Sequence, residues 1–475
     1  MGNCNCASAE TKDDAPPTGA PAKLTKAGDT KPNGAPFSYL ASHRAIKHLG
    51  RGAAADTWLF VDRKRNRLVA IKLFPRPIPA NLRDSTLSEI KCQTELGPGH
   101  INLINVYEAI LTPDHLGIVM EYAAGGALTA HVAERWGAAK PGGLILTEDE
   151  ARYFFRQFIE AVDYCHRNNT AHRDLKLDNT LLDDQKPPFL KICDFGFARH
   201  WATDSLYRTK SHLGTPEYMS PELLRNQSKD KKALKDYDPR SVDVWASGVL
   251  LLVSLCGAFP WDHTRQHDNF NNDQELDLWL QEVNKQWNES PFIADNVNAL
   301  SPEARDLLDR IFMLDPTKRI TIPEIMKHPW YTKALLPEHQ EALDSLHEEQ
   351  RQVDEHLHHR KLDPVKMAER NKKLEQIVDE ACSSEAVQNS SSHGRQLRPL
   401  HVLDFKHREI TRLDLTERAV LLGQSCKCSE EHATVADRAA GLAEAKSGKL
   451  HESASIKSFK SNSSSNGAEK SNGHA

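Results

Sequence analysis

Residues 172–196 read HRDLKLDNTLLDDQKPPFLKICDFG, and this stretch decides how the rest of the chain is interpreted. Asp174 carries a carboxylate that can accept a proton, and Lys176 supplies a point charge beside it. Asn179 and Asp194 carry hard oxygen donors of the kind that Mg²⁺ prefers. A hydroxyl that attacks the γ-phosphate of a nucleotide needs a proton acceptor, and a divalent metal that offsets charge on the phosphate oxygens. The order of these side chains predicts a phosphoryl-transfer site, in which the first three are catalytic and the last two are metal ligands.

Length and composition exclude several classes of protein. At 475 residues the chain could hold two or three average domains, and its 39% hydrophobic and 27% charged residues are near globular averages. A net charge of −5 gives no reason to expect a nucleic-acid partner. The nine cysteines lack the paired spacing of a disulfide framework or a zinc site, which predicts a reducing, cytoplasmic location. No run reaches the roughly 18 to 20 apolar residues of a membrane span, so residues 249–256 (VLLLVSLC) are interpreted as a buried core helix.

The amino-terminal residues 1–43 are interpreted as a disordered linker with a lipid-modified start. The first residues, MGNCNCAS, offer Gly2 for N-myristoylation and Cys4 and Cys6 for palmitoylation, which would bring the protein into contact with a membrane. Cys6 stands where the myristoylation motif usually has Ser or Thr, so an unmodified end is the alternative. Residues 9–36 are rich in Pro, Gly, Ala, Asp and Lys without apolar periodicity, which is typical of a linker.

A glycine pair interrupts the next segment, residues 46–74 (IKHLGRGAAADTWLFVDRKRNRLVAIKLF). Apolar and polar residues alternate on both sides of the pair, which predicts twisted antiparallel strands. Gly50 and Gly52 allow the backbone to approach phosphate groups closely. A G-x-G pair alone is usually only a turn, and Ala55 replaces the third glycine of a full phosphate-binding loop. The sequence VAIK, which ends at Lys72, favours the nucleotide-binding interpretation.

Two helices are predicted around the strands that follow. The first covers residues 82–96 and supplies an anion for Lys72, with Glu89 as the best-placed partner and Glu95 as the alternative. The second begins at a capping box of Thr147 and Glu150 and leads into the catalytic stretch.

Residues 44–331 resemble a eukaryotic serine/threonine protein kinase. The sequences that carry the resemblance are VMEYAAGG, EDEARYFFRQFI, HRDLKLDNTLLD, LKICDFGFA and KRITIPEIMKHPWY. They are most similar to the plant sucrose-non-fermenting-related kinases, subfamily two, within the calcium/calmodulin-dependent-like group. The resemblance implies ATP-dependent, Mg²⁺-dependent phosphorylation of serine or threonine hydroxyls in protein substrates, in stress or nutrient signalling.

The same resemblance implies the fold and the nucleotide site. The fold is α+β and bilobal, with an N-lobe antiparallel sheet plus helix αC, a mainly helical C-lobe, and ATP in the cleft between them. Met120 would be the gatekeeper residue, and residues 121–123 the hinge whose backbone groups bind adenine. The implied ATP-binding residues are Leu49, Gly50, Gly52, Thr57, Ala70, Lys72, Glu89, Met120, Glu121, Ala123 and Leu181.

The resemblance also implies contacts that hold the catalytic loop. Glu222 is expected to pair with Arg319, and Asp243 to anchor the loop from below. Thr215 is expected to contact the catalytic carboxylate and lysine directly.

A phosphate switch is predicted next to the catalytic loop. Arg173 precedes Asp174, and its guanidinium is expected to lack a partner until an anion arrives. In the sequence KSHLGT, Ser211 lies where the resembling kinases carry their activating serine. The resemblance therefore implies that Ser211 is the activation-loop phosphosite, with Thr209 and Ser205 as the next candidates. An upstream kinase or autophosphorylation would supply the phosphate.

Residues 332–382 are charged and helix-prone, and they are predicted to form a regulatory extension. Four apolar residues near its end share one helix face: Leu374, Ile377, Val378 and Ala381. That face resembles the short helix that the subfamily docks beside helix αC, and a solvated extension without contacts is the alternative. Residues 383–475 are predicted to be mostly disordered, with a weak amphipathic segment at 397–422.

Two rival functions are less well supported. A pseudokinase or membrane-tethered scaffold would bind partners without transferring phosphate, and only the incomplete glycine loop favours it. A calmodulin-regulated kinase would need a basic amphipathic helix just after Trp330, where the chain is instead acidic and rich in histidine.

Overall fold

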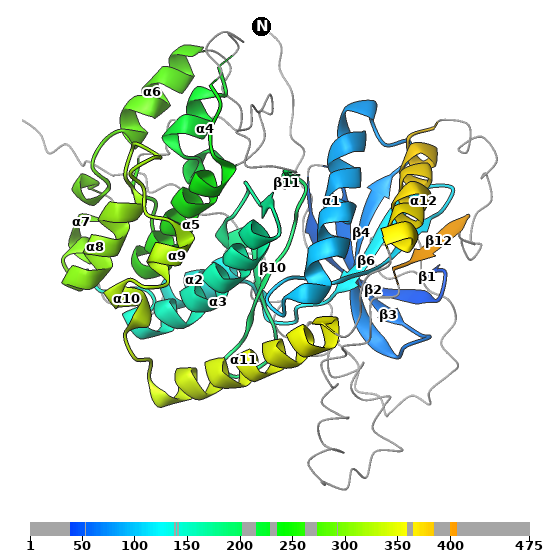
Figure 1. The fold of residues 1–475 in the computed structure, drawn as a ribbon, viewed down its shortest axis with the longest axis horizontal. Helices are drawn as coiled ribbons and strands as arrows, with labels where there is room; N and C mark the ends of the chain where they lie inside the picture. The colour runs from blue at the N-terminus through cyan, green and yellow to red at the C-terminus, as the bar shows by residue number, and fades with distance from the viewer. Residues whose placement is uncertain are drawn as a thin grey trace, which may run out of the picture.

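The computed structural model describes residues 39–52, 54–136, 139, 142–201, 215–228, 235–261, 273–291, 293–358, 364–383 and 400–405. In Figure 1 these residues form two parts, a sheet with two helices on one side and a larger group of helices on the other. The chain passes from the first part to the second between β6 (His115–Glu121) and α2 (Leu128–Trp136). The predicted bilobal α+β arrangement is therefore confirmed.

The N-lobe is built on a seven-stranded sheet with the order β1-β2-β3-β4-β6-β5-β12, and all its neighbouring strands are antiparallel. The longer strands are rich in β-branched and aromatic residues, which suit a pleated, half-buried surface. Besides β6, the strands are β1 (Tyr39–Leu40), β2 (His43–Arg51), β3 (Asp56–Asp62), β4 (Arg67–Pro75), β5 (Val106–Leu111) and β12 (His401–Asp404).

The folded part extends beyond the predicted kinase domain at two places. Residues 39–43 are predicted to belong to the linker, but β1 pairs with β2 and Leu40 is fully buried. Within the tail that was predicted to be mostly disordered, β12 pairs with β5, from His401 opposite Leu111 to Asp404 opposite Glu108. Backbone pairing along a sheet edge stabilises this strand, and a four-residue sequence does not reveal such pairing.

Two helices cover one face of this sheet (Figure 1). α1 (Arg83–Leu96) lies between the short 3-10 turns η1 (Ala80–Leu82) and η2 (Gly97–Gly99), and α12 (Pro364–Cys382) lies beside it. The four apolar residues of the predicted helix face in α12 are buried in one cluster with Ile90 of α1. The docked alternative is therefore the one that the structure contains.

The C-lobe is organised around α3 (Glu148–Arg167) and α5 (Pro239–Cys256). α5 begins at Asp238, whose side chain accepts a hydrogen bond from a backbone N–H, and it ends at Gly257 with a φ of 73°. A left-handed residue is a common helix terminator, and glycine adopts it without strain. This helix is long and apolar enough to cross a membrane, but 89% of it is buried inside the fold, as predicted for a core helix.

The predicted capping box at the start of α3 is only half formed. Thr147 Oγ1 accepts a hydrogen bond from the Glu150 N–H at 3.1 Å. The Glu150 carboxylate does not return to Thr147, because it contacts His131 and Arg135 of α2, each at 3.0 Å.

The other described C-lobe helices are α4 (Pro221–Arg225), α6 (Asp273–Val283), α7 (Ala294–Val297), α8 (Pro302–Ile311), α9 (Ile322–Ile325) and α10 (Pro329–Thr332). Two small sheets, with the orders β10-β9-β7 and β11-β8, consist of β7 (Gly126–Ala127), β8 (Thr170–Ala171), β9 (Thr180–Leu182), β10 (Leu190–Ile192) and β11 (Arg199–His200). After the C-lobe, α11 (Pro337–His358) runs along α3 toward the N-lobe (Figure 1).

Candidate active site

The catalytic loop is held from below by Asp243, in the middle of α5. This fully buried carboxylate accepts hydrogen bonds from the backbone N–H groups of His172, at 2.9 Å, and Arg173, at 2.7 Å. It also lies 2.8 Å from His166 Nε2. Arg173 has a φ of 64°, a conformation that a non-glycine residue keeps only when its surroundings hold it. The anchoring contact predicted for Asp243 is therefore present.

Asp174 lies at the centre of a small group of polar side chains. Its Oδ2 accepts a hydrogen bond from Asn179 Nδ2 at 2.9 Å and lies 3.2 Å from Lys176 Nζ. Lys176 Nζ also donates to Thr215 Oγ1 at 2.8 Å, so the threonine contacts the lysine as expected. Burial raises the pKa of Asp174 above its usual value, although the Lys176 ammonium opposes this. A nearby hydroxyl would therefore meet a carboxylate that is more basic than an exposed one.

Asp194 lies on the other side of this group. Its Oδ1 accepts hydrogen bonds from Lys72 Nζ and from the Gly196 N–H, both at 3.3 Å. Burial disfavours the charged carboxylate, but Lys72 and the Gly196 N–H outweigh it and hold the pKa of Asp194 below its usual range. The two expected metal ligands are tied together, because the Cys193 N–H donates to the Asn179 carbonyl oxygen at 2.9 Å.

These side chains suit a divalent metal. Among the residues that the structure describes, no donor reaches the Asn179 side-chain oxygen or Asp194 Oδ2. Carboxylate and amide oxygens are the donors that Mg²⁺ takes, and it commonly binds to one or two protein groups together with substrate phosphates. The described residues contain no cluster of three or more His, Cys, Asp or Glu side chains for a metal. A metal here would therefore depend on nucleotide phosphates for its remaining ligands.

Lys72 joins the two lobes of the site. Its Nζ lies 2.6 Å from Glu89 Oε1 of α1 and 3.3 Å from Asp194 Oδ1. Burial alone would lower the pKa of Lys72, but Glu89 and Asp194 outweigh it and raise the pKa, so the ammonium stays charged. The alternative partner, Glu95, lies instead 3.8 Å from Arg370 of α12. The ion pair predicted with Glu89 is the one that forms.

Buried apolar side chains lie near residues 121–123, the predicted hinge between the lobes. Ala70 pairs with Met120 across β4 and β6. Both are buried in one cluster with Ala123, and the partly buried Leu181 packs against that cluster. The Glu121 N–H is used inside the lobe, since it donates to the Asn105 carbonyl at 2.8 Å. Adenine recognition at the hinge would therefore depend on the Glu121 carbonyl and on the backbone of residues 122–123.

The glycine loop closes the hairpin between β2 and β3. Gly50 pairs with Thr57, and the Gly52 N–H donates to the Ala55 carbonyl at 2.8 Å. A Cβ on Gly52 would lie 3.2 Å from that carbonyl oxygen, whereas none of the described atoms lies within 4 Å of a Cβ on Gly50. Ala55 lacks a positive φ and buries its methyl group, so the missing third glycine leaves no strain here. Leu49, before the pair, is 37% exposed.

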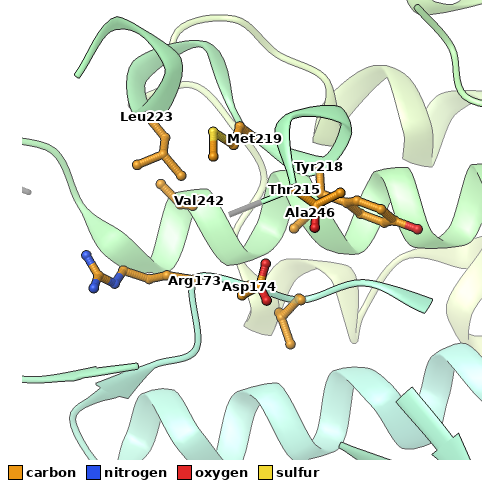
Figure 2. Close-up of a pocket in the computed structure, with 9 residues that line it drawn as sticks. Arg173, Asp174, Thr215, Tyr218, Met219, Leu223, Val242 and Ala246 are labelled. Atoms are coloured by element: carbon orange, nitrogen blue, oxygen red, sulfur yellow. The ribbon is translucent and has the colours of Figure 1, made fainter. Parts of the chain in front are cut away.

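The environment of Arg173 differs from the prediction. Its guanidinium donates to the Phe197 carbonyl oxygen at 2.6 and 2.8 Å and to the Tyr237 hydroxyl at 3.2 Å. The expectation that it lacks a partner is therefore wrong, although these partners are neutral. Figure 2 shows the Arg173 side chain extending away from Asp174 along the edge of a small pocket under Thr215. Ser211, Thr209 and Ser205 lie outside the described residues, as do Gly2, Cys4 and Cys6.

A second buried ion pair joins α4, the helix that follows the Thr215 segment, to Arg319. Arg319 donates to both carboxylate oxygens of Glu222, at 2.6 and 3.0 Å, and to the Ser241 carbonyl at 2.8 Å. The pair predicted between Glu222 and Arg319 is present.

Sequence reasoning missed a polar contact behind the hinge. Lys191 is 3% exposed and places its Nζ 2.6 Å from Glu121 Oε1, and Glu121 Oε2 accepts a hydrogen bond from the Asn105 N–H at 3.2 Å. A lysine between two apolar residues of a buried strand was the available signal, because buried charges need partners.

Comparison with known proteins identifies the family. The protein kinase domain model matches residues 43–331. Serine/threonine-protein kinase SRK2E of Arabidopsis thaliana is 39% identical over 295 residues, which cover 62% of this chain and 72% of that protein. Serine/threonine-protein kinase SAPK9 of Oryza sativa subsp. japonica is 39% identical over 293 residues, covering 61% and 72%. Serine/threonine-protein kinase SAPK3 of Oryza sativa subsp. indica is 40% identical over 295 residues, covering 62% and 78%. The chain therefore belongs to the protein kinase family, whose members use ATP and a divalent metal to phosphorylate proteins.

Proposed function

We propose that this kinase phosphorylates serine and threonine hydroxyls, with Asp174 as proton acceptor and Mg²⁺ as the metal on Asn179 and Asp194. The observation that carries the proposal is the contact of Lys72 with both Glu89 and Asp194. That contact joins the phosphate-binding side of the cleft to the catalytic side, which a scaffold that transfers nothing has no need to keep. The relatives named above are serine/threonine-protein kinases, which supports the choice of acceptor.

The test is transfer of radioactive phosphate from ATP to generic basic peptides that differ only in their single acceptor. Peptides with Ser or Thr should be labelled, and the Tyr peptide should not. Activity should disappear when EDTA removes the metal and return with added Mg²⁺. No transfer to any peptide by phosphorylated, folded enzyme would favour the scaffold.

We also propose that a phosphate on Ser211 activates the enzyme through Arg173. The guanidinium has only neutral acceptors among the described residues, and a phosphate would form stronger, charge-assisted bonds with it. Ser211→Ala should cut kcat strongly with little change in Tm. Arg173→Ala should make the rate indifferent to phosphorylation. Full activity in Ser211→Ala, or active enzyme that carries no phosphate at Ser211, would move the switch to another residue.

The source of this phosphate is a separate question. We propose either autophosphorylation or an upstream kinase, and an inactive substrate separates the two. Purified active enzyme should phosphorylate Asp194→Asn protein at Ser211 if the reaction is autocatalytic in trans. If it does not, and a cell extract does, an upstream kinase is responsible.

For location, we propose a cytoplasmic kinase that reaches membranes through acylation of Gly2 together with Cys4 or Cys6. One myristoyl chain binds a membrane only marginally, so a second lipid is needed. Lysines in the linker give no polybasic help, because acidic residues balance them: Glu10, Asp13, Asp14 and Asp29. Wild-type protein should sediment with membranes, and the Cys4→Ser, Cys6→Ser double variant should be soluble. A double variant that stays in the membrane pellet would refute the two-lipid requirement.

The resemblance to the plant subfamily further suggests a role in stress or nutrient signalling. Enzyme isolated from osmotically stressed or nutrient-starved cells should then be more active than enzyme from untreated cells. Equal activity under all three conditions would remove this role.

A further inference from the structure

Helix α11 reaches from the C-lobe to the segment that follows α1, and the Gln350 side chain of α11 forms hydrogen bonds with the backbone of that segment. Gln350 donates from Nε2 to the Gly99 carbonyl oxygen at 3.0 Å and accepts at Oε1 from the Ile101 N–H, also at 3.0 Å. Its amide thus serves one donor and one acceptor of the backbone on either side of His100, as a neighbouring strand would. Nε2 also donates to Asp354 Oδ1 at 2.9 Å, which fixes the orientation of the amide.

Helix α11 has a fixed position on the C-lobe, because it packs along α3. Leu343, Leu346 and Val353 are buried in the C-lobe core. The Leu336 N–H donates to Asp149 Oδ1 at 2.8 Å, and His347 Nε2 lies 3.0 Å from Glu160 Oε2. Gln350 therefore projects from an element that is fixed to the C-lobe.

The receiving segment, residues 97–102, is closely packed and connects to the active site on both sides. A Cβ on Gly99 would lie 1.9 Å from the Tyr164 hydroxyl oxygen, so the segment lies directly against α3. On one side it ends α1, the helix that carries Glu89 two turns earlier.

On the other side, the segment is hydrogen-bonded to β10, the strand that precedes Asp194. The Ile192 N–H donates to the Asn102 carbonyl at 2.7 Å, and Asn102 Nδ2 donates to the Leu190 carbonyl at 2.7 Å. Ile192 ends β10, two residues before Asp194. One backbone segment thus follows the helix that carries Glu89 and bonds to the strand that precedes Asp194.

We propose that Gln350 is a positioning residue for phosphoryl transfer, which holds residues 99–101 so that Glu89 and Asp194 meet Lys72. It touches no substrate. This inference rests on the proposed function. Since Lys72 is expected to hold the nucleotide phosphates, loosening its partners should affect the use of ATP and leave peptide binding alone.

The test compares full-length Gln350→Met with Gln352→Ala. Methionine keeps the length of the side chain without its hydrogen bonds. Gln352 lies on the same helix, and among the residues that the structure describes its side chain bonds only to Glu348. Loss of two ordinary hydrogen bonds should raise the KM for ATP and lower kcat, with kcat/KM for ATP falling about 3- to 10-fold. The KM for peptide should not change, and Gln352→Ala should match the wild type.

Two further measurements separate positioning from general stability. The Ile101 amide should exchange its hydrogen faster in Gln350→Met, while amides in the core of α5 should not. If Gln350 acts through Glu89, adding Gln350→Met to Glu89→Gln should cause less than its single-variant effect.

Faster Ile101 exchange with an unchanged KM for ATP would show that the contact is only structural, and unchanged exchange would show that it does not form in solution. Either result overturns the proposal. A wild-type enzyme that transfers no phosphate refutes the proposed function instead, since the exchange measurement needs no activity.

Discussion

The two sides of the active site are held by different parts of the chain. On the C-lobe side, the backbone of the loop with Asp174 donates hydrogen bonds to Asp243 of α5. The large hydrophobic core around α5 is formed mostly by the kinase domain itself. On the N-lobe side, Glu89 projects from α1, whose cluster includes residues of α12 and Phe405 from far along the chain. The catalytic side is therefore largely self-contained, whereas the position of Lys72 depends on the C-terminal extension.

The composition of the helices explains this difference. α5 buries residues 242–256, most of which are apolar, including Trp245 and Val249. α1 instead buries polar residues such as Thr86, Gln93 and Thr94 together with few large apolar ones. Because most helical stability comes from packing of apolar faces, α1 needs a neighbour on its outer side. α12 supplies this neighbour, and its contacts include ion pairs of Glu375 with Lys91 and Asp379 with Arg83, both at 2.6 Å.

The largest effect is expected from two single variants, each of which removes one charged group from the active site. Asp194→Asn should abolish transfer because it removes a metal ligand and a partner of Lys72, and Lys72→Met should do nearly as much. Loss of one preorganised electrostatic contact lowers kcat by about 100-fold or more. Steady-state kinetics measure this, and thermal unfolding shows that the fold is intact. If both variants keep more than a tenth of the wild-type kcat, the roles assigned to the two sides are wrong.

The next effect tests whether the N-lobe side depends on the extension. Leu374 of α12 is fully buried in the N-lobe cluster, and Leu374→Ala should lower the free energy of unfolding by about 2–5 kcal/mol, as large-to-small changes do in a core. Undocking of α12 should also raise the KM for ATP. Val365→Ala is the matched control on the same helix, because Val365 is 66% exposed. An unchanged KM for ATP in destabilised Leu374→Ala would show that the position of Lys72 does not depend on α12.

A smaller effect is expected at β12, the strand of the tail that pairs with β5 at the edge of the N-lobe sheet. Phe405 is buried, its N–H donates to the Tyr107 carbonyl at 3.0 Å, and Asp404 pairs with Arg65 at 3.1 Å. Phe405→Ala should lower the free energy of unfolding by about 1–3 kcal/mol, since one edge of the site can relax. Val402→Ala is the control, because Val402 is 47% exposed. Equal Tm values for the two variants would mean that β12 adds nothing to the N-lobe.

The sequence predicts the catalytic side of the site better than it predicts the contacts of the C-terminal residues. Chemistry fixes residue type and spacing in the catalytic stretch, so the sequence alone identifies Asp174, Asn179 and Asp194. The extension follows no such constraint. The sequence HVLD of β12 has no strand pattern of its own, and only the exposed edge of β5 makes it a strand. Gln350 stands among charged residues of a helix, and its function depends on a backbone far away in sequence.

The glycine loop and the cap of α3 show that a local sequence motif does not determine which contacts form in the fold. Ala55 departs from the motif, yet its backbone conformation tolerates a methyl group, so the motif was stricter than the geometry requires. Glu150 fits a capping box, yet His131 and Arg135 compete for its carboxylate. Local patterns predict the side chains that are available, and tertiary neighbours determine which contact forms.

The smallest expected effect lies at the segment where the two sides meet. His100 is buried beside Tyr164, and its Nδ1 accepts a hydrogen bond from the Asn102 N–H at 3.2 Å. Burial, assisted by the charges of Lys191, Arg167 and His347, lowers the pKa of His100 from 6.5 to about 3. The unfolded chain therefore binds a proton below pH 6.5 that the folded protein does not bind.

This difference gives the sign of the pH effect. The stability that comes from a neutral His100 is complete above pH 6.5 and is lost as the pH falls toward 3, by about 1.4 kcal/mol for each pH unit below 6.5. His100→Asn keeps an acceptor near the Asn102 N–H but cannot titrate. Urea unfolding at pH 7.5 and 5.5 should show that the variant loses less stability than the wild type by about 1.4 kcal/mol, the contribution of one pH unit. An equal loss in both proteins would mean that His100 is protonated in the folded state, and that the junction between α1 and the C-lobe is more open to water than the contacts of residues 97–102 indicate.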